Sequence, residues 1–117
     1  LEAEAYAYKG ELQKSADIVD IIRQRVKLPA LSADKKSTKE SMIDAVLHER
    51  RLELAFEGER WFDLVRNDKV ESTLNNLNSR DSGRLAQHRE FSSDLHLMPI
   101  PQTAIDKNEN LKQNQGY

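Results

Sequence analysis

The sequence predicts an all-α fold made of a helical hairpin and a long kinked helix, with a long irregular C-terminal part. Three observations predict it. In the first half of the chain, apolar side chains recur at spacings of three and four residues, the period of a helix. Gly10, Pro29 and Gly58 divide that half into helical lengths. From residue 67 onwards Asn, Ser and Asp are frequent, and these residues favour loops.

The first helix is expected over residues 1–9. Leu1, Ala5 and Tyr8 are spaced by four and three residues and therefore lie on one helical face. Gly10 should end this helix, because glycine readily adopts the positive φ found at many helix C-termini. An alanine-rich helix that ends in glycine resembles half of a tetratricopeptide unit.

The second helix should begin near Ser15 and end before Pro29. Serine is a favourable N-cap, and Asp17 would follow in the first turn, where the helix dipole favours a negative charge. Proline cannot continue a helix. The two helices would form a tetratricopeptide-like hairpin, with an apolar stripe on the second helix made of Ile18, Ile21, Ile22 and Val26.

A polar linker over residues 30–38 should lead into a third helix from about Lys39 to Phe56. Ser37, followed three residues later by Glu40, fits a capping box at its start. The core stripe of this helix should consist of Met42 or Ile43, Val46, Leu47, Leu54 and Ala55.

Gly58 is predicted to break the third helix, because glycine costs about 1 kcal/mol relative to alanine inside a helix. A short helix should follow over residues 60–66. Residues 67–94 are expected to be loop-rich, with one possible helix around 70–77. Pro99 and Pro101 should hold extended backbone, followed by a short helix that includes residues 103–105.

With 117 residues, the chain is long enough for one domain and too short for two independent cores. Charged residues make up 32% of the chain and hydrophobic residues 38%, which is polar for a compact domain. The chain also starts in helix-forming sequence without a methionine. We therefore expect residues 1–117 to form a single partial domain, the C-terminal part of a longer protein.

Composition argues against several function classes. The net charge of −2 does not provide the basic excess typical of nucleic-acid binding. The absence of cysteine excludes a disulfide scaffold and a cysteine-based zinc site. The histidines have no metal-ligand spacing, and the four glycines are isolated, so neither a metal nor a cofactor is expected. These histidines are His48, His88 and His96.

The most informative stretch is the signature segment, residues 49–66, which interleaves charged and bulky apolar side chains. On a continuous helix, Glu49, Glu53 and Glu57 would share one face, with arginines at positions 50 and 60 within reach. Two carboxylates at such a distance could perform acid/base chemistry on a glycoside. We prefer a salt-bridged scaffold, because neighbouring arginines would lower the pKa values that a general acid needs raised.

Trp61 allows two interpretations as well. A flat aromatic ring could stack on a sugar. However, Phe62, Leu64 and Val65 follow directly, and a buried tryptophan contributes much packing energy. We therefore expect Trp61 to be a packing residue, as we do Tyr6 and Tyr8.

Several separated motifs resemble the SusD/RagB family of outer-membrane nutrient-binding lipoproteins. Residues 3–10 look like the family's Ala-Glu-Ala-Tyr helix. Residues 19–25 look like its Leu-Asn-x-Ile-Arg-x-Arg stretch, with Asp20 in place of the usual Asn. The signature segment follows, then Pro99-Ile100-Pro101, and finally Gln113 to Tyr117, with Gln115 in place of the usual Pro. The structural signature comprises Glu49, Arg50, Glu57, Gly58, Arg60, Trp61, Asp63, Pro99 and Pro101.

The resemblance implies a helical binder and no enzyme. Such proteins capture oligosaccharide or another nutrient at the cell surface and pass it to a TonB-dependent, SusC-like transporter in the outer membrane. They are attached through an N-terminal lipidated cysteine that is absent from these residues. The resemblance does not identify ligand-binding residues here, although residues 67–94 are the part most able to vary with the ligand. The alternatives are a tetratricopeptide-type protein-interaction module and, less favoured, an acid/base hydrolase that uses Glu53 or Glu57.

Overall fold

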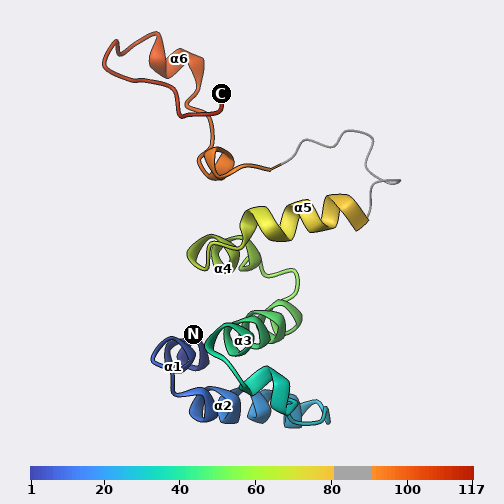
Figure 1. Cartoon of the computed structure of the whole chain (residues 1–117). Helices are drawn as coiled ribbons and strands as arrows, with labels where there is room; N and C mark the ends of the chain where they lie inside the picture. Colours follow the sequence, from blue (N-terminus) through green and yellow to red (C-terminus); the bar gives the residue numbers. More distant parts are fainter. Residues whose placement is uncertain (81–90) are drawn as a thin grey trace. The chain divides into compact units, whose positions relative to one another are not determined.

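The computed structural model describes residues 1–80 and 91–117, and the side chains of residues 1–77 and 91–117. All regular elements in these ranges are helical, as predicted (Figure 1). The chain divides into two compact units, Leu1–Arg60 and Trp61–Tyr117. That residues 1–117 form a single domain stays a prediction.

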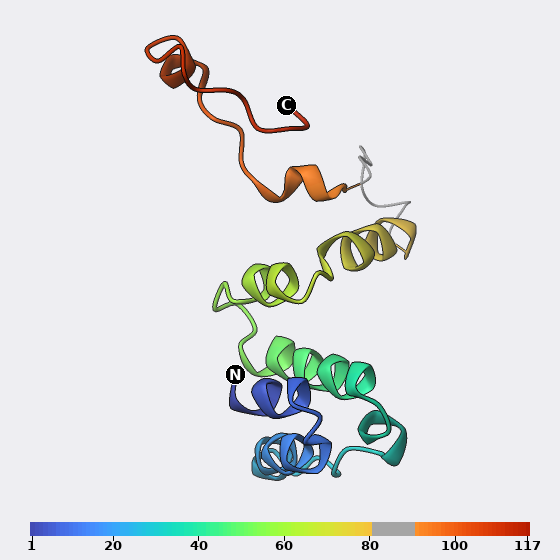
Figure 2. The ribbon, with the colours of Figure 1, turned by 60° about the vertical axis from the view of Figure 1, so that its left-hand side comes forward.

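The first unit contains three α-helices and one short 3₁₀ helix. In chain order they are α1 (Glu2–Tyr8), α2 (Leu12–Arg25), η1 (Ala33–Lys36) and α3 (Lys39–Glu53). Both views show α1 lying against α2 and α3 (Figures 1 and 2). The hairpin of α1 and α2 is therefore completed into a three-helix cluster by α3.

The turn after α1 forms as the sequence predicts. Gly10 has a φ of +80°, and its N–H donates to the carbonyl of Ala7 while the N–H of Glu11 donates to that of Tyr6. This pair of hydrogen bonds is the Schellman motif, which satisfies carbonyls left free at a helix end. The same pattern ends α2, where Lys27 takes the left-handed position with a φ of +60°.

The predicted helix starts need correction. α2 begins at Leu12, and Ser15 is not its cap: the Ser15 hydroxyl is buried and donates to the carbonyl of Ala3, 2.7 Å away. α3 is capped by Thr38, whose Oγ1 accepts the N–H of Ser41 at 3.1 Å. Ser37 cannot take this role, because its backbone is helical and an N-cap needs an extended one.

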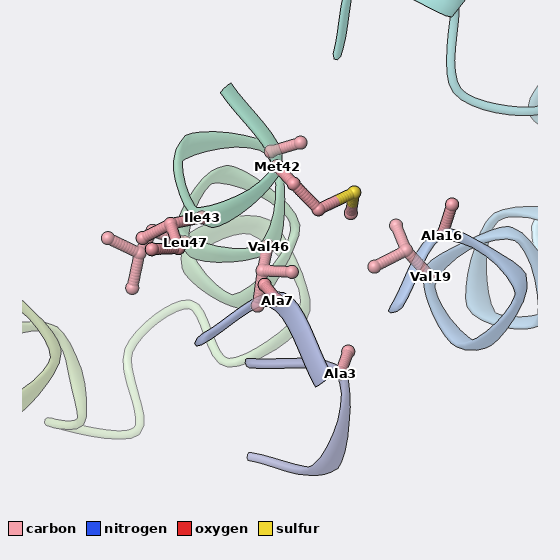
Figure 3. Packing of buried hydrophobic residues seen from close by; sticks show 9 residues of the cluster. Ala3, Ala7, Ala16, Val19, Met42, Ile43, Val46 and Leu47 are labelled. Atoms are coloured by element: carbon pink, nitrogen blue, oxygen red, sulfur yellow. The ribbon is translucent and has the colours of Figure 1, made fainter. Parts of the chain in front are cut away.

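The core of the first unit is built largely from small residues (Figure 3). In Figure 3, Met42 points from α3 towards Ala16 and Val19 of α2. Small side chains let the three helix backbones approach closely. The buried residues of this cluster are Ala3, Ala7, Ala16, Val19, Met42, Ile43, Ala45, Val46 and Leu47.

The apolar faces predicted on the first two helices are only partly the buried ones. Leu1 and Tyr8 are exposed, and α1 instead buries Ala3, Glu4 and Ala7. On α2, the buried residues are Ser15, Ala16 and Val19. Of the predicted stripe, Ile18 packs half-buried against the core and Ile22 is half-buried, whereas Ile21 and Val26 are exposed. The most exposed apolar side chains of the two helices are thus Leu1, Tyr8, Ile21 and Val26.

α3 ends at Glu53, three residues before the predicted end. Phe56 and Gly58 have φ values of +69° and +82°, so the backbone leaves the helical region between Leu54 and Glu59. Of the predicted stripe on α3, Leu54 is half-buried and Ala55 is exposed. The short helix predicted over residues 60–66 is confirmed as α4 (Arg60–Arg66).

In the second unit α4 is followed by α5 (Val70–Arg80), η2 (Ser93–His96) and α6 (Gln102–Ile105). The possible helix inside the loop-rich segment 67–94 is thus real, and it is longer than the expected 70–77. Residues 81–90 of that segment lie outside the described residues, and so does His88. Leu64 and Val70 are buried here, together with Asp63.

We predict that Met42→Ala lowers the free energy of unfolding by about 2–5 kcal/mol, because a fully buried side chain leaves a cavity when it is truncated. Leu52→Ala on the same helix is the matched control, since Leu52 is half exposed. Urea unfolding followed by circular dichroism measures both changes. Equal losses from the two substitutions would contradict the assignment of the core.

Candidate functional site

A largely buried ion pair connects α2 and α3. Nη1 of Arg23 donates to Oε2 of Glu49 at 2.8 Å, with the two side chains only 17% and 7% exposed. Nε of Arg23 also donates to the carbonyl of Pro29 at 2.7 Å. Arg23 therefore binds the signature segment with one edge of its guanidinium group and the turn after α2 with another.

A second ion pair joins the same two helices. Arg25 donates to Glu53, and this hydrogen bond raises the pKa of Arg25. Unlike the first pair, this one faces solvent, with 62% of the Arg25 side chain exposed. Glu53 thus bonds across to α2, a partner that the expected spacing to Arg50 within one helix did not suggest.

Asp20, the acidic residue in the motif over residues 19–25, joins α2 to the segment that follows it. Asp20 accepts the N–H of Leu31 at 2.7 Å and pairs with Nζ of Lys36 at 3.0 Å. It therefore fixes the segment that leads into η1 onto α2. An asparagine could accept the Leu31 N–H but would carry no charge to pair with Lys36.

The middle of the signature segment forms the exposed turn between α3 and α4. Glu57 is exposed and lies outside α3, so the expectation that it shares a helical face with Glu49 and Glu53 is wrong. Gly58 supplies a positive φ, the position that favours glycine. Arg60 donates to the carbonyl of Leu47 at 3.1 Å and so attaches the end of the turn to α3.

The last part of the signature segment lies in the second unit. Asp63 is 1% exposed, pairs with Nη2 of Arg66 at 2.6 Å, and offers its carbonyl to the side chain of Asn67 at 2.8 Å. The carboxylate thus pairs with an arginine one turn along the helix, and the backbone carbonyl of the same residue holds the turn that follows. Like Gly10 and Lys27, Asp68 adopts a positive φ in a Schellman motif at the helix end.

Trp61 belongs to a cluster of three rings. Its ring centroid lies 6.0 Å from that of Phe91 and 6.2 Å from that of His96, both in edge-to-face geometry. Such arrangements are favourable because a ring edge is positive and a ring face is negative. Trp61 is nevertheless 39% exposed, so it packs against neighbours and also presents surface to solvent.

Side-chain amides hold two extended segments of the second unit. The Gln113 amide accepts the N–H of Ile100 at 2.8 Å and donates to its carbonyl at 2.9 Å. Asn75 makes the same two contacts with the backbone of Phe91, at 3.0 and 3.1 Å. Pro99 and Pro101 have no N–H, so Ile100 has the one backbone donor between them, and Gln113 accepts it.

Three acids of the signature segment are engaged in ion pairs. Glu49 and Asp63 are buried against arginines, and Glu53 pairs with Arg25. Within the described ranges no three metal-ligating side chains come together. None of the described helices is long and apolar enough to cross a membrane. The signature segment instead joins elements to one another.

Comparisons with known proteins identify the family of this chain. A sequence model of the SusD family matches residues 1–117, the whole chain. The chain belongs to the SusD family. The SusD-like protein P38 of Formosa agariphila is 33% identical over 91 residues, which cover 73% of this chain and 18% of that protein.

A solved SusD structure has the same fold. The crystal structure of a SusD superfamily protein from Bacteroides vulgatus ATCC 8482 matches 98% of this chain with a TM-score of 0.76 and 31% identity. The match covers 25% of that solved chain. This SusD-family chain therefore spans a quarter or less of the length of the relatives it matches.

Sequence reasoning identified the acids of this SusD-family chain but not their partners. Arg23 and Arg25, the partners of Glu49 and Glu53, both belong to the motif over residues 19–25. That motif was the available signal for the cross-helix pairs. The scaffolding roles of Arg50, Glu57 and Trp61 stay predictions, and Arg50 has interaction partners within the structure.

We predict that Glu49→Ala destabilises the first unit by about 3–5 kcal/mol, because it leaves the largely buried Arg23 without its counter-charge. Glu53→Ala is the matched control, one helical turn along, and should cost far less because its pair is solvent-exposed. Urea unfolding measures both. Similar losses would show that burial does not distinguish the two pairs.

Proposed function

We propose that this chain is part of a cell-surface binding protein that captures oligosaccharide or another nutrient and delivers it to a TonB-dependent, SusC-like transporter. The observation that carries the proposal is the SusD family match over the whole chain, supported by the shared fold at 31% identity. Its location would be the outer membrane, exposed at the surface, with attachment through an N-terminal lipid anchor outside these 117 residues.

The proposed mechanism is capture without bond cleavage. Ion-paired acids support this, because the carboxylates of Glu49, Glu53 and Asp63 are each bonded to an arginine. The signature residues would hold the scaffold, and the ligand would contact other parts of the whole protein. A tetratricopeptide-type interaction module is not favoured, because the family match accounts for the entire chain.

We predict that the complete protein binds at least one member of a panel of purified α-glucan, β-glucan, xylan and mannan oligosaccharides without cleaving it. Isothermal titration calorimetry measures binding, and a reducing-end assay on the same mixtures measures cleavage. The absence of binding across this panel would contradict the glycan form of the proposal. Release of reducing ends would contradict the claim that the protein is no enzyme.

The role of Trp61 can be tested in the same experiment. We predict that Trp61→Ala lowers the melting temperature and leaves the oligosaccharide affinity unchanged, because the ring packs on Phe91 and His96. Phe62→Ala is the control, since Phe62 is the neighbouring ring and is 64% exposed. Loss of affinity at an unchanged melting temperature would instead assign Trp61 to the sugar site.

A further inference from the structure

Residues 26–38, which connect α2 to α3, form a strap on the first unit. The regular structure in this strap is η1, which is four residues long. Every residue of the strap is exposed except Leu31 and Lys36, which are half-buried. A segment with few buried side chains opens locally at a lower free energy than a packed core. The strap should therefore open more easily than the three-helix cluster beside it.

The two half-buried residues of the strap share one partner. Oδ1 of Asp20 accepts the N–H of Leu31 at 2.7 Å, and Oδ2 of the same carboxylate pairs with Nζ of Lys36 at 3.0 Å. The side chains of Asp20 and Lys36 are only 18% and 23% exposed, so solvent screens this pair less than a surface pair. One carboxylate thus holds the strap at two separate positions.

The other bonds of the strap to α2 and α3 lie near its ends and face solvent. Nε of Arg23 donates to the carbonyl of Pro29 at 2.7 Å. The hydroxyl of Ser41 donates to the carbonyl of Lys35 at 3.3 Å. Water can replace a protein partner at such exposed positions at little cost. The attachment of the strap therefore depends mainly on Asp20.

The strap forms part of the wall of a hollow beside α3. This hollow has a volume of about 310 Å³. It is lined by Leu31 and Lys35 of the strap and by Asp44, Ala45 and His48 of α3. Opening of the strap would withdraw the first two of these residues and would uncover Ala45, which is 6% exposed in the closed arrangement.

We propose that the strap opens as one unit, that the Asp20 carboxylate is the latch that holds it closed, and that its opening admits small molecules to the hollow beside α3. The two oxygens of one carboxylate couple the Leu31 backbone to η1, because they move together. Loss of the Lys36 pair should therefore also loosen the Leu31 N–H. An asparagine at position 20 could accept this N–H but would bring no charge to Lys36.

Amide hydrogen exchange followed by NMR in low, non-denaturing urea tests whether the strap opens as a unit. We expect the N–H groups of Leu31 and Lys35 to be equally protected and to depend little on urea, because a local opening exposes little surface. The N–H of Val46 in the core should be better protected and should depend steeply on urea. Protection of Leu31 and Lys35 that differs by more than about tenfold, or that follows the urea dependence of Val46, would overturn the proposal.

Lys36→Met tests the latch, because it removes the charge that pairs with Asp20 and leaves the Leu31 N–H and its acceptor in place. We expect it to speed the exchange of the Leu31 and Lys35 N–H groups by about fivefold, as for the loss of a modest ion pair. Lys39→Met is the matched control, since Lys39 is exposed and lies over the ring of Tyr8 instead. Unchanged exchange in Lys36→Met, acceleration of only one of the two N–H groups, or equal acceleration in the control would reject the latch.

Thiol reactivity measures access to the hollow, because the chain has no native cysteine. Ala45→Cys places a thiol on the wall of the hollow, and Leu52→Cys, at a half-exposed position of the same helix, is the control. We expect Lys36→Met to speed the reaction of the residue-45 thiol with 5,5′-dithiobis(2-nitrobenzoic acid) as much as it speeds amide exchange, with little dependence on urea, and to leave the control thiol unchanged. A residue-45 rate that Lys36→Met does not alter, or that rises steeply with urea, would reject the role of the strap in opening the hollow.

Discussion

The ion pair between Arg23 and Glu49 is the interaction on which the arrangement of the first unit depends. It joins the end of α2 to the middle of α3, and the same guanidinium group holds the turn at Pro29. Because both charges are largely removed from water, the pair tolerates the loss of neither partner. The alanine-rich core beside it provides close contact between helices, but alanine side chains fit in many registers. The ion pair selects one of them.

The helices of this chain could be predicted from local signals, and the faces that they bury could be predicted only in part. Gly10, Pro29 and Gly58 mark real helix ends, and α4 begins where the sequence suggests. The faces were assigned only partly correctly because periodicity gives weight to large apolar residues. In α1 and α2 most of the buried helix contacts are made by alanine, serine and Val19, and the larger side chains of Tyr8 and Ile21 are exposed. A helix that is apolar on two sides gives no single answer from its sequence alone.

The acidic residues of the candidate site could be predicted from the sequence, but the residues that they bond to could not. The acids of the signature segment are obvious in the sequence, but the partners of Glu49 and Glu53 lie 26 and 28 residues away on α2. The spacing argument failed at Glu57 because it assumed a helix that Phe56 and Gly58 interrupt. The amide contacts of Asn75 and Gln113 were equally hidden, since a side chain that bonds to distant backbone leaves no periodic signal.

The Gln113 amide has a consequence for how this chain can change over generations. It bonds to the main chain of Ile100 and to the N–H of Asn114, and the amide of Asn114 likewise bonds to the carbonyl of Met98, 2.6 Å away. The side chains at positions 98 and 100 make none of these bonds. Substitutions there can accumulate without loosening the closing segment, whereas a change at residue 113 removes three hydrogen bonds at once. Among descendants, substitutions should therefore be tolerated at positions 98 and 100 and selected against at position 113.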